Sequence, residues 1–189
     1  TEQELDELRQ DLQRTIWDRE LDLKLHVGAE HHYSVVGELM VEGNLVAYPR
    51  GDSFLMEFPL GPLPPKWDEL LFRLQVKKMQ PIIAHVERYP DVQQDLELVG
   101  RFKERGCAIL VNLSSLVGGW DRAARKVARE LVRSGQVDAV NTDMHRAEEV
   151  DGLREGLAEL ENLVGAEGRR KLCWENPARL AGIPIGDAP

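Results

Sequence analysis

Five polar residues stand at or just after the ends of short apolar runs: Glu30, Glu57, His85, Asp143 and His145. The runs read LKLHVGAE, SFLMEFP, PIIAHVER and DAVNTDMH. Carboxylates and imidazoles are costly at the end of a buried strand unless a partner or a metal ion neutralises or coordinates them. Because strand ends meet at one end of a barrel or an open parallel sheet, the five residues predict a single metal-centred active site there.

The histidines and Asp143 also have explanations that need no metal. His85, taken alone, is compatible with a core histidine satisfied by hydrogen bonds. Asp143 and His145 form a D-x-H pair, which in a strand-like segment points both side chains to the same side and lets them reach one metal ion or two adjacent ones. The alternative is a helix-capping Asp143 followed by an exposed His145.

The glutamates raise the same question. Glu57 lies inside FLMEF, where an ionised carboxylate costs several kcal/mol unless it is paired or coordinated. A buried salt bridge with Arg88 or Arg50 is the alternative for Glu57, and a plain loop carboxylate is the alternative for Glu30. The adjacent His31 and His32 would face opposite ways in a strand, so at most one of them is expected in the site.

Arg88 follows His85 by three residues and adds a different chemistry. A guanidinium beside a metal cluster is suited to holding a phosphate through two hydrogen bonds. Its alternative is a salt bridge with Glu87 or with one of the other carboxylates. Cys173 and Arg179 have the Cys-x5-Arg spacing of cysteine-dependent tyrosine phosphatases, but the residues between them include no glycine and contain a proline, which argues against a phosphate loop.

The elements that must position these residues are short apolar runs alternating with longer amphipathic segments. The pattern predicts strands over 23–29, 45–47, 53–58, 81–85, 107–112 and 137–141. It predicts helices over 3–18, 35–42, 66–79, 91–105, 121–134 and 147–164, with shorter helices near 166–173 and 176–181. Such alternation is typical of βα units and indicates an α/β fold with a parallel sheet.

Bulk composition limits the possible functions. The 189 residues suit one domain, 1–189, with 42% hydrophobic and 30% charged residues. A net charge of −9 argues against general nucleic-acid binding, which needs a basic face. No apolar run reaches the roughly 20 residues of a membrane span, so no membrane insertion is expected. Cys107 and Cys173 lie far apart, which favours free thiols and a cytoplasmic location.

Six segments carry a family resemblance: GAEHHYS, FLMEFP, PIIAHVERYP, GCAILVNLSSL, VDAVNTDMH and ENPARL. With them, the chain resembles the bacterial manganese-dependent protein-tyrosine phosphatases of the polymerase-and-histidinol-phosphatase (PHP) superfamily over about Thr1 to Ile185. These capsule and exopolysaccharide regulators dephosphorylate a tyrosine kinase. The resemblance implies a distorted (β/α)7, TIM-like barrel and three divalent ions, usually manganese.

The same resemblance assigns roles to the candidate residues. Glu30, Glu57, His85, Asp143 and His145 match metal ligands of the family, and Arg88 matches an arginine that binds the substrate phosphate. The implied reaction hydrolyses phosphotyrosine on proteins with metal-activated water and no cysteine nucleophile. The partner implied is a phosphotyrosine protein, a bacterial tyrosine kinase of capsule or exopolysaccharide synthesis.

This sequence departs from the family pattern in two places. The family begins with a strand carrying His-x-His, then an Asp and another His, before the helix that opens this chain, so we expect an N-terminal part of the barrel before Thr1. An apolar stripe on that helix, which needs a partner surface, supports the same expectation: Leu5, Leu8, Leu12 and Ile16. A second family arginine falls near Val150, where Arg146 or Arg154 is the available substitute.

Two other functions remain open at the level of sequence. The first is a phosphatase of the same superfamily that acts on a small molecule such as histidinol phosphate. The second is a degenerate, non-catalytic PHP module that binds metal weakly or serves as a partner surface.

Overall fold

The computed structural model describes residues 2–49 and 52–185, and a parallel sheet runs through them. Its strand order follows the sequence, β1-β2-β3-β4-β5, and every neighbouring pair is parallel. The strands are β1 (Glu30–His32), β2 (Ser53–Glu57), β3 (Gln80–Ile83), β4 (Ala108–Asn112) and β5 (Ala139–Asn141). The α/β class with a parallel sheet is therefore confirmed.

The sheet is open in the described part of the chain. β1 and β5 are its two edges, and no described pairing joins them. The closed (β/α)7 barrel that the resemblance implies is thus not confirmed. The open sheet still brings the carboxyl ends of its strands to one edge, because parallel strands all run in the same direction.

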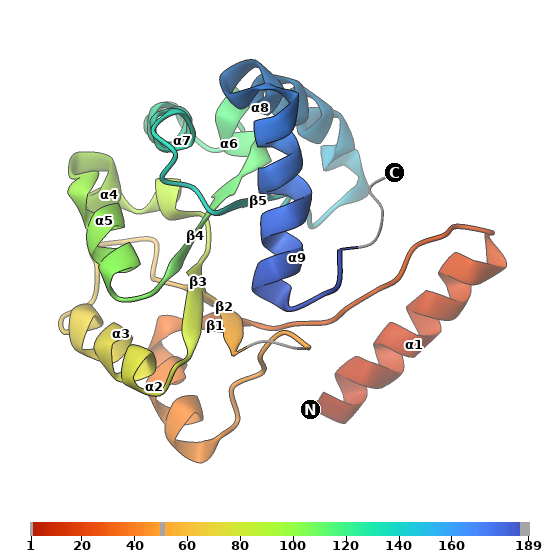
Figure 1. The fold of residues 1–189 in the computed structure, drawn as a ribbon, viewed down its shortest axis with the longest axis horizontal. Helices are drawn as coiled ribbons and strands as arrows, with labels where there is room; N and C mark the ends of the chain where they lie inside the picture. Colours follow the sequence, from red (N-terminus) through yellow and green to blue (C-terminus); the bar gives the residue numbers. More distant parts are fainter. Residues whose placement is uncertain (1, 50–51, 186–189) are drawn as a thin grey trace.

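Helices follow most strands and surround the sheet (Figure 1). The α-helices are α1 (Glu2–Asp18), α2 (Tyr33–Glu42), α3 (Trp67–Val76), α4 (Pro90–Gln94), α5 (Glu97–Glu104), α6 (Leu113–Val117), α7 (Arg122–Arg133), α8 (Val150–Arg170) and α9 (Asn176–Ala181). Two short 3₁₀ turns, η1 (Val86–Arg88) and η2 (Ala147–Glu149), and one π-helical turn, η3 (Lys171–Glu175), complete the described elements.

Alternating residues of strands β2 to β5 enter two different hydrophobic clusters. Ile109 and Val111 of β4 belong to the main core, whereas Ala108 and Leu110 pack in a smaller cluster with Leu180 of α9. All five residues of β4 are buried, as expected for a parallel strand covered on both faces. The strand predicted from the continuous apolar run AILV is therefore present, and it lies inside the sheet between β3 and β5.

Helix α1 stands apart from the rest of the molecule in Figure 1. Its apolar residues Leu8, Leu12 and Trp17 are largely exposed. The helix is tied to the following segment by Gln13, whose amide donates to the carbonyl of Leu23 and accepts from the backbone N–H of Leu25. The partner surface expected for this stripe is not supplied by the described residues.

Two predicted strands are wrong. Residues 23–29 form no strand, and Leu23 is exposed, so the apolar run there is not a buried one. Residues 45–47 also form no strand, because the backbone groups of Val46 bond to the ring of His31 instead of to a neighbouring strand. The first strand lies only over Glu30–His32.

Three helix predictions need adjustment. The helix predicted over 91–105 is two helices, α4 and α5, separated where Asp95 adopts an extended conformation and its side chain accepts from the N–H of Glu97. The predicted 147–164 helix begins as a 3₁₀ turn and, with the predicted 166–173 helix, merges into α8 and η3 across a kink at Gly165. The short helix α6 was not predicted. Within the described residues, every helix is too short or too polar to cross a membrane.

Candidate active site

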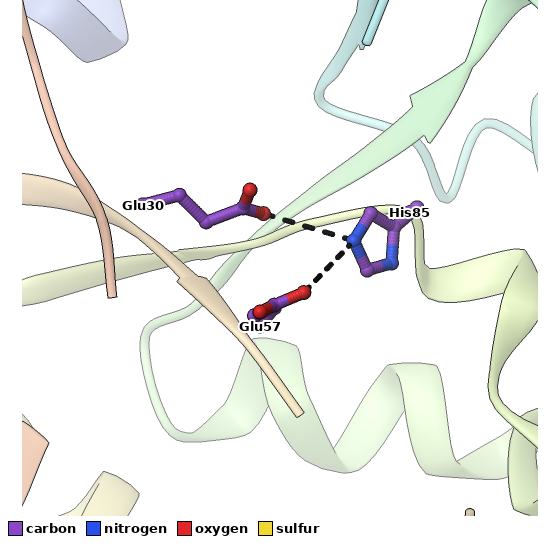
Figure 2. A group of neighbouring side chains, drawn as sticks. All are labelled: Glu30, Glu57 and His85. Atoms are coloured by element: carbon purple, nitrogen blue, oxygen red, sulfur yellow. Dashed lines mark ion pairs between the residues drawn. The ribbon is translucent and has the colours of Figure 1, made fainter. Parts of the chain in front are cut away.

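Glu30, the first residue of β1, converges with Glu57, the last residue of β2, and with His85, two residues after β3 (Figure 2). One ligand atom from each lies within 4.8 Å of the others. Nε2 of His85 is 3.7 Å from Oε1 of Glu30 and 3.5 Å from Oε2 of Glu57. Three residues separated widely in sequence thus form one cluster.

Adjacent parallel strands bring these three residues together. β1 and β2 are paired so that Glu30 lies opposite Leu55, two residues before Glu57, and the backbone N–H of Ala84 donates to the carbonyl of Met56 just beyond β3. His85 then adopts a left-handed conformation with φ of 35°, which turns the chain out of the strand. A non-glycine residue with such a φ is strained, and strained backbone is concentrated at functional sites.

The electrostatics of the cluster favour a bound cation. Burial, followed by the positive charge of Arg88, lowers the pKa of His85, so the ring is held in the neutral form that coordinates metals. Burial, followed by repulsion from Glu57 and Asp143, raises the pKa of Glu30. A divalent ion between the two glutamates would relieve that repulsion.

The donor set passes a simple test for one divalent ion. It offers two carboxylates and a neutral imidazole, ligands that manganese accepts. Nδ1 of His85 is buried and has no hydrogen-bond partner among the described residues, so the ring is not fixed as a satisfied core histidine. The alternative explanation, a core histidine whose ring nitrogens are satisfied by hydrogen bonds, therefore does not apply to His85.

Arg88 and Asp143 form a second, adjoining part of the site. Nη1 of Arg88 lies 2.9 Å from Oδ2 of Asp143, and both side chains are mostly buried. The amide of Asn112 donates to the same carboxylate oxygen at 2.8 Å. Asp143 is thus paired with an arginine and does not cap a helix, and the pair is the salt bridge to a site carboxylate that the sequence left open as the alternative for Arg88. Among the described residues, the salt bridge from Arg88 to Glu57 is not formed. The other proposed partner of Glu57, Arg50, lies outside the described residues.

His145 is not brought into the cluster. Its side chain is 77% exposed, and its Nδ1 lies 2.9 Å from the backbone carbonyl of Asp143. His31 and His32 are also used elsewhere, since His31 bonds to the backbone of Val46 and His32 caps α2 through Ser34. Neither of the adjacent histidines joins the three clustered residues.

Sequence reasoning missed a buried polar group beneath the site. Glu87 is fully buried, and its Oε1 accepts from the hydroxyl of Ser115 at 2.6 Å and from the backbone N–H of Asn112 at 3.3 Å. Burial raises the pKa of Glu87 to about 7, against the opposing hydrogen bonds. No local sequence signal reveals this burial, because both partners of the Glu87 carboxylate belong to the next βα unit.

A cavity of about 600 Å³ opens beside Arg88 and Asp143. Trp120 and Leu153 contribute to its walls, together with acidic residues of the loop before α8. The guanidinium carbon of Arg88 lies 4.4 Å from the centroid of the Trp120 ring. Neither Arg146 nor Arg154, the substitutes considered for a second arginine, is among the described residues that line it.

The cysteine-based alternative has no structural support. Cys173 lies in the π-helical turn η3 and Arg179 in α9, so the intervening backbone is helical and does not form an anion-binding loop. Burial raises the pKa of the Cys173 thiol, which disfavours a reactive thiolate. Cys107 is buried inside the core, where its pKa rises to about 12.

Two known proteins are similar to this chain in sequence. Tyrosine-protein phosphatase YwqE of Bacillus subtilis (strain 168) is 27% identical over 150 residues, which are 77% of this chain and 59% of the relative. CapC of Staphylococcus aureus is 28% identical over 131 residues, 67% of this chain and 50% of that protein. The chain therefore spans between half and three fifths of the length of these relatives.

Structural comparison supports the fold. A solved structure from work on YwqE of Bacillus subtilis and CpsB of Streptococcus pneumoniae, described as unique metal-dependent tyrosine phosphatases, matches with a TM-score of 0.81 at 24% identity. The match covers 95% of this chain and 74% of the solved one. The family model described as capsular polysaccharide synthesis, CpsB/CapC, matches residues 1–181. This chain is accordingly a member of the CpsB/CapC family.

Proposed function

We propose that this chain is a metal-dependent phosphatase that hydrolyses phosphotyrosine on proteins. The observation that carries the proposal is the convergence of Glu30, Glu57 and His85 within 4.8 Å, with Arg88 one turn beyond His85. A cation site next to a guanidinium is the arrangement that a phosphoryl group requires. The name of the Bacillus subtilis relative, a tyrosine-protein phosphatase, supports phosphotyrosine as the substrate.

Each residue has a proposed role. Glu30, Glu57 and His85 would hold a divalent ion, and we propose manganese because the oxygen-rich donor set suits a hard cation. Asp143 and His145 are proposed as ligands of further ions, up to three in a complete site. A divalent ion bound there would supply positive charge for the phosphoryl oxygens and lower the pKa of water.

Arg88 is proposed to bind and orient the phosphoryl group. Arg88 lines the cavity and carries five N–H donors, of which Asp143 engages Nη1, so donors remain for a ligand oxygen. An ion pair with Asp143 and a contact with the ring of Trp120 hold the guanidinium in position. Such a preorganised donor pays little reorganisation cost when charge develops on the phosphoryl oxygens.

The wider setting is proposed on the same basis. The substrate is proposed to be a bacterial tyrosine kinase of capsule or exopolysaccharide synthesis, since the family model concerns capsular polysaccharide synthesis. A cytoplasmic location suits such a substrate and the free thiols of Cys107 and Cys173. We also propose that residues 1–189 belong to one PHP-type domain, a distorted (β/α)7 barrel. The sequential order of the five parallel strands supports it.

Hydrolysis assays test the proposal. With manganese present, the chain should release phosphate from a phosphotyrosyl peptide and from p-nitrophenyl phosphate, and chelation should abolish both activities. Turnover of histidinol phosphate in preference to both would favour the small-molecule phosphatase instead. Absence of hydrolysis together with absence of bound metal would contradict the proposal and favour a non-catalytic module.

A further inference from the structure

Trp120 occupies an unusual position for a large aromatic side chain. It is 48% exposed, yet it lines the cavity of about 600 Å³ that also contains Arg88 and Asp143. Exposed tryptophan is enriched where proteins bind other molecules, because it offers a large rigid surface at a low cost in conformational entropy. The described contacts of its ring include the guanidinium of Arg88, at 4.4 Å.

The backbone around Trp120 is held on both sides. Gly118 ends α6 with φ of 98°, and the N–H of Gly119 donates to the carbonyl of Ser114 at 2.8 Å. A Cβ on Gly119 would lie 2.8 Å from that of Ser114, so the close turn depends on the glycine. On the other side, Asp121 caps α7 by accepting from the N–H of Ala124. The tryptophan is therefore presented by a short, anchored turn.

Arg88 fixes the spatial relation between a phosphate and this ring. The guanidinium that would bind the phosphoryl group lies against the Trp120 ring, and both residues line one cavity, so a group esterified to a phosphate held there would be within reach of Trp120. Leu153 adds an apolar side chain to the lining of the cavity, and Glu148 and Glu149 add acidic ones. A neutral aromatic ring suits these surroundings better than an anionic or strongly hydrated group does.

We propose that Trp120 is a specificity-determining residue that packs against the aromatic ring of an aryl phosphate bound at Arg88. This inference rests on the proposed phosphatase function and adds the basis for selecting phosphotyrosine over aliphatic phosphate esters. The expected preference is about tenfold in affinity, the value that corresponds to one good aromatic pair.

Binding of phosphonate analogues tests the proposal without turnover. Calorimetric titrations of the manganese-loaded protein would compare phosphonomethyl-phenylalanine, a non-hydrolysable analogue of phosphotyrosine, with 2-amino-4-phosphonobutanoic acid, its aliphatic counterpart. The wild type should bind phosphonomethyl-phenylalanine about tenfold more tightly than the aliphatic analogue, and Trp120→Ala should remove most of that preference. Trp120→Phe should retain much of it.

Controls separate this role from a merely structural one. If Trp120 served only to hold Arg88, Trp120→Ala would weaken both phosphonates equally. Trp174→Ala replaces a tryptophan of similar exposure, 40%, that does not line the cavity, and it should leave the preference unchanged. Equal affinities in the wild type, or a preference that persists in Trp120→Ala, would overturn the inference. Selective aryl binding without any hydrolysis would instead count against the proposed function.

Discussion

Nη1 of Arg88 lies 2.9 Å from Oδ2 of Asp143, which joins the turn after β3 to the loop after β5. Asn112, the last residue of β4, donates to the same carboxylate oxygen at 2.8 Å. Three consecutive strand ends therefore meet at one carboxylate. The arrangement holds the guanidinium near the Glu30, Glu57 and His85 cluster, and its positive charge contributes to lowering the pKa of His85.

Arg88→Lys tests whether the guanidinium geometry matters beyond its charge. Lysine keeps the positive charge opposite Asp143 but cannot offer two parallel donors to a phosphate. We expect kcat/KM for p-nitrophenyl phosphate to fall by about 100-fold, the usual loss for one preorganised donor, with little change in the folded structure. Arg101→Lys is a matched control, because Arg101 lies over the ring of Trp67 away from the site. Equal losses in both variants would contradict this role.

Cys173→Ser tests the cysteine-based alternative. The thiol is half-buried, its pKa is raised by burial, and it lies in a helical turn, so it cannot act as a preorganised nucleophile. Steady-state hydrolysis of a phosphotyrosyl peptide should be unchanged within about twofold. A loss of activity by orders of magnitude, with the fold intact, would restore the cysteine mechanism.

Glu87 predicts a specific dependence of stability on pH. Its folded pKa of about 7 is raised above the ordinary value of 4.5, so the folded state holds the proton more tightly than the unfolded state does. The contribution of Glu87 to stability is therefore largest at low pH and is lost as pH rises from about 4.5 to about 7. Between pH 5 and pH 8 the loss is roughly 2–3 kcal/mol.

Denaturant unfolding of the metal-free protein measures this effect. The free energy of unfolding of the wild type, relative to that of Glu87→Gln, should fall by that amount between the two pH values, since glutamine cannot titrate. Ser115 keeps an acceptor in the variant, so a collapse of the fold is not expected. Parallel pH curves for the two proteins would show that Glu87 does not titrate in this range.

The contact between α6 and α8 predicts a difference between two glycine substitutions. A Cβ on Gly156 would lie 2.6 Å from the backbone carbonyl of Leu113, whereas one on Gly100 in α5 would meet nothing within 4 Å. Gly156→Ala should lower the free energy of unfolding by about 1–3 kcal/mol through overpacking. Gly100→Ala should raise it by up to about 1 kcal/mol through helix propensity. Thermal unfolding of both variants measures these changes, and similar shifts in Tm for the two variants would contradict the close packing of α6 against α8.

The sequence predicts strand-end residues well where the strand is buried on both faces, because such a strand is a continuous apolar run and a polar residue at its end is easily recognised. Phe54, Met56 and Ile83 are all buried, so Glu57 and His85 stand out against them. The run that ends at Glu30 misleads, since Leu23 is exposed and only three residues pair as a strand. Hydrophobic patterning reports apolar character and does not report whether a neighbouring strand is available.

The remaining features depend on tertiary contacts that no local pattern contains. Glu87 looks like a surface charge in HVERYP, yet it is buried because Ser115 and the backbone of Asn112 bond to its carboxylate from the next βα unit. His145 looks equivalent to Asp143 in the D-x-H pair, but Asp143 has φ of 49°, which leaves the strand geometry that would align the two side chains. The role of Trp120 depends likewise on its contact with Arg88.

Manganese binding measured on the wild type and on Glu57→Gln tests the central claim most directly. Glu57 supplies one of the three clustered ligand atoms, and the amide of glutamine keeps its size while losing its charge. Calorimetric titration of the chelator-treated wild type should show at least one manganese ion per chain. Glu57→Gln should weaken that binding at least about tenfold, while the control Glu69→Gln, a change in the first turn of α3, should not. A wild type that binds no manganese, or a Glu57→Gln variant that binds it as tightly as the wild type, would contradict the account.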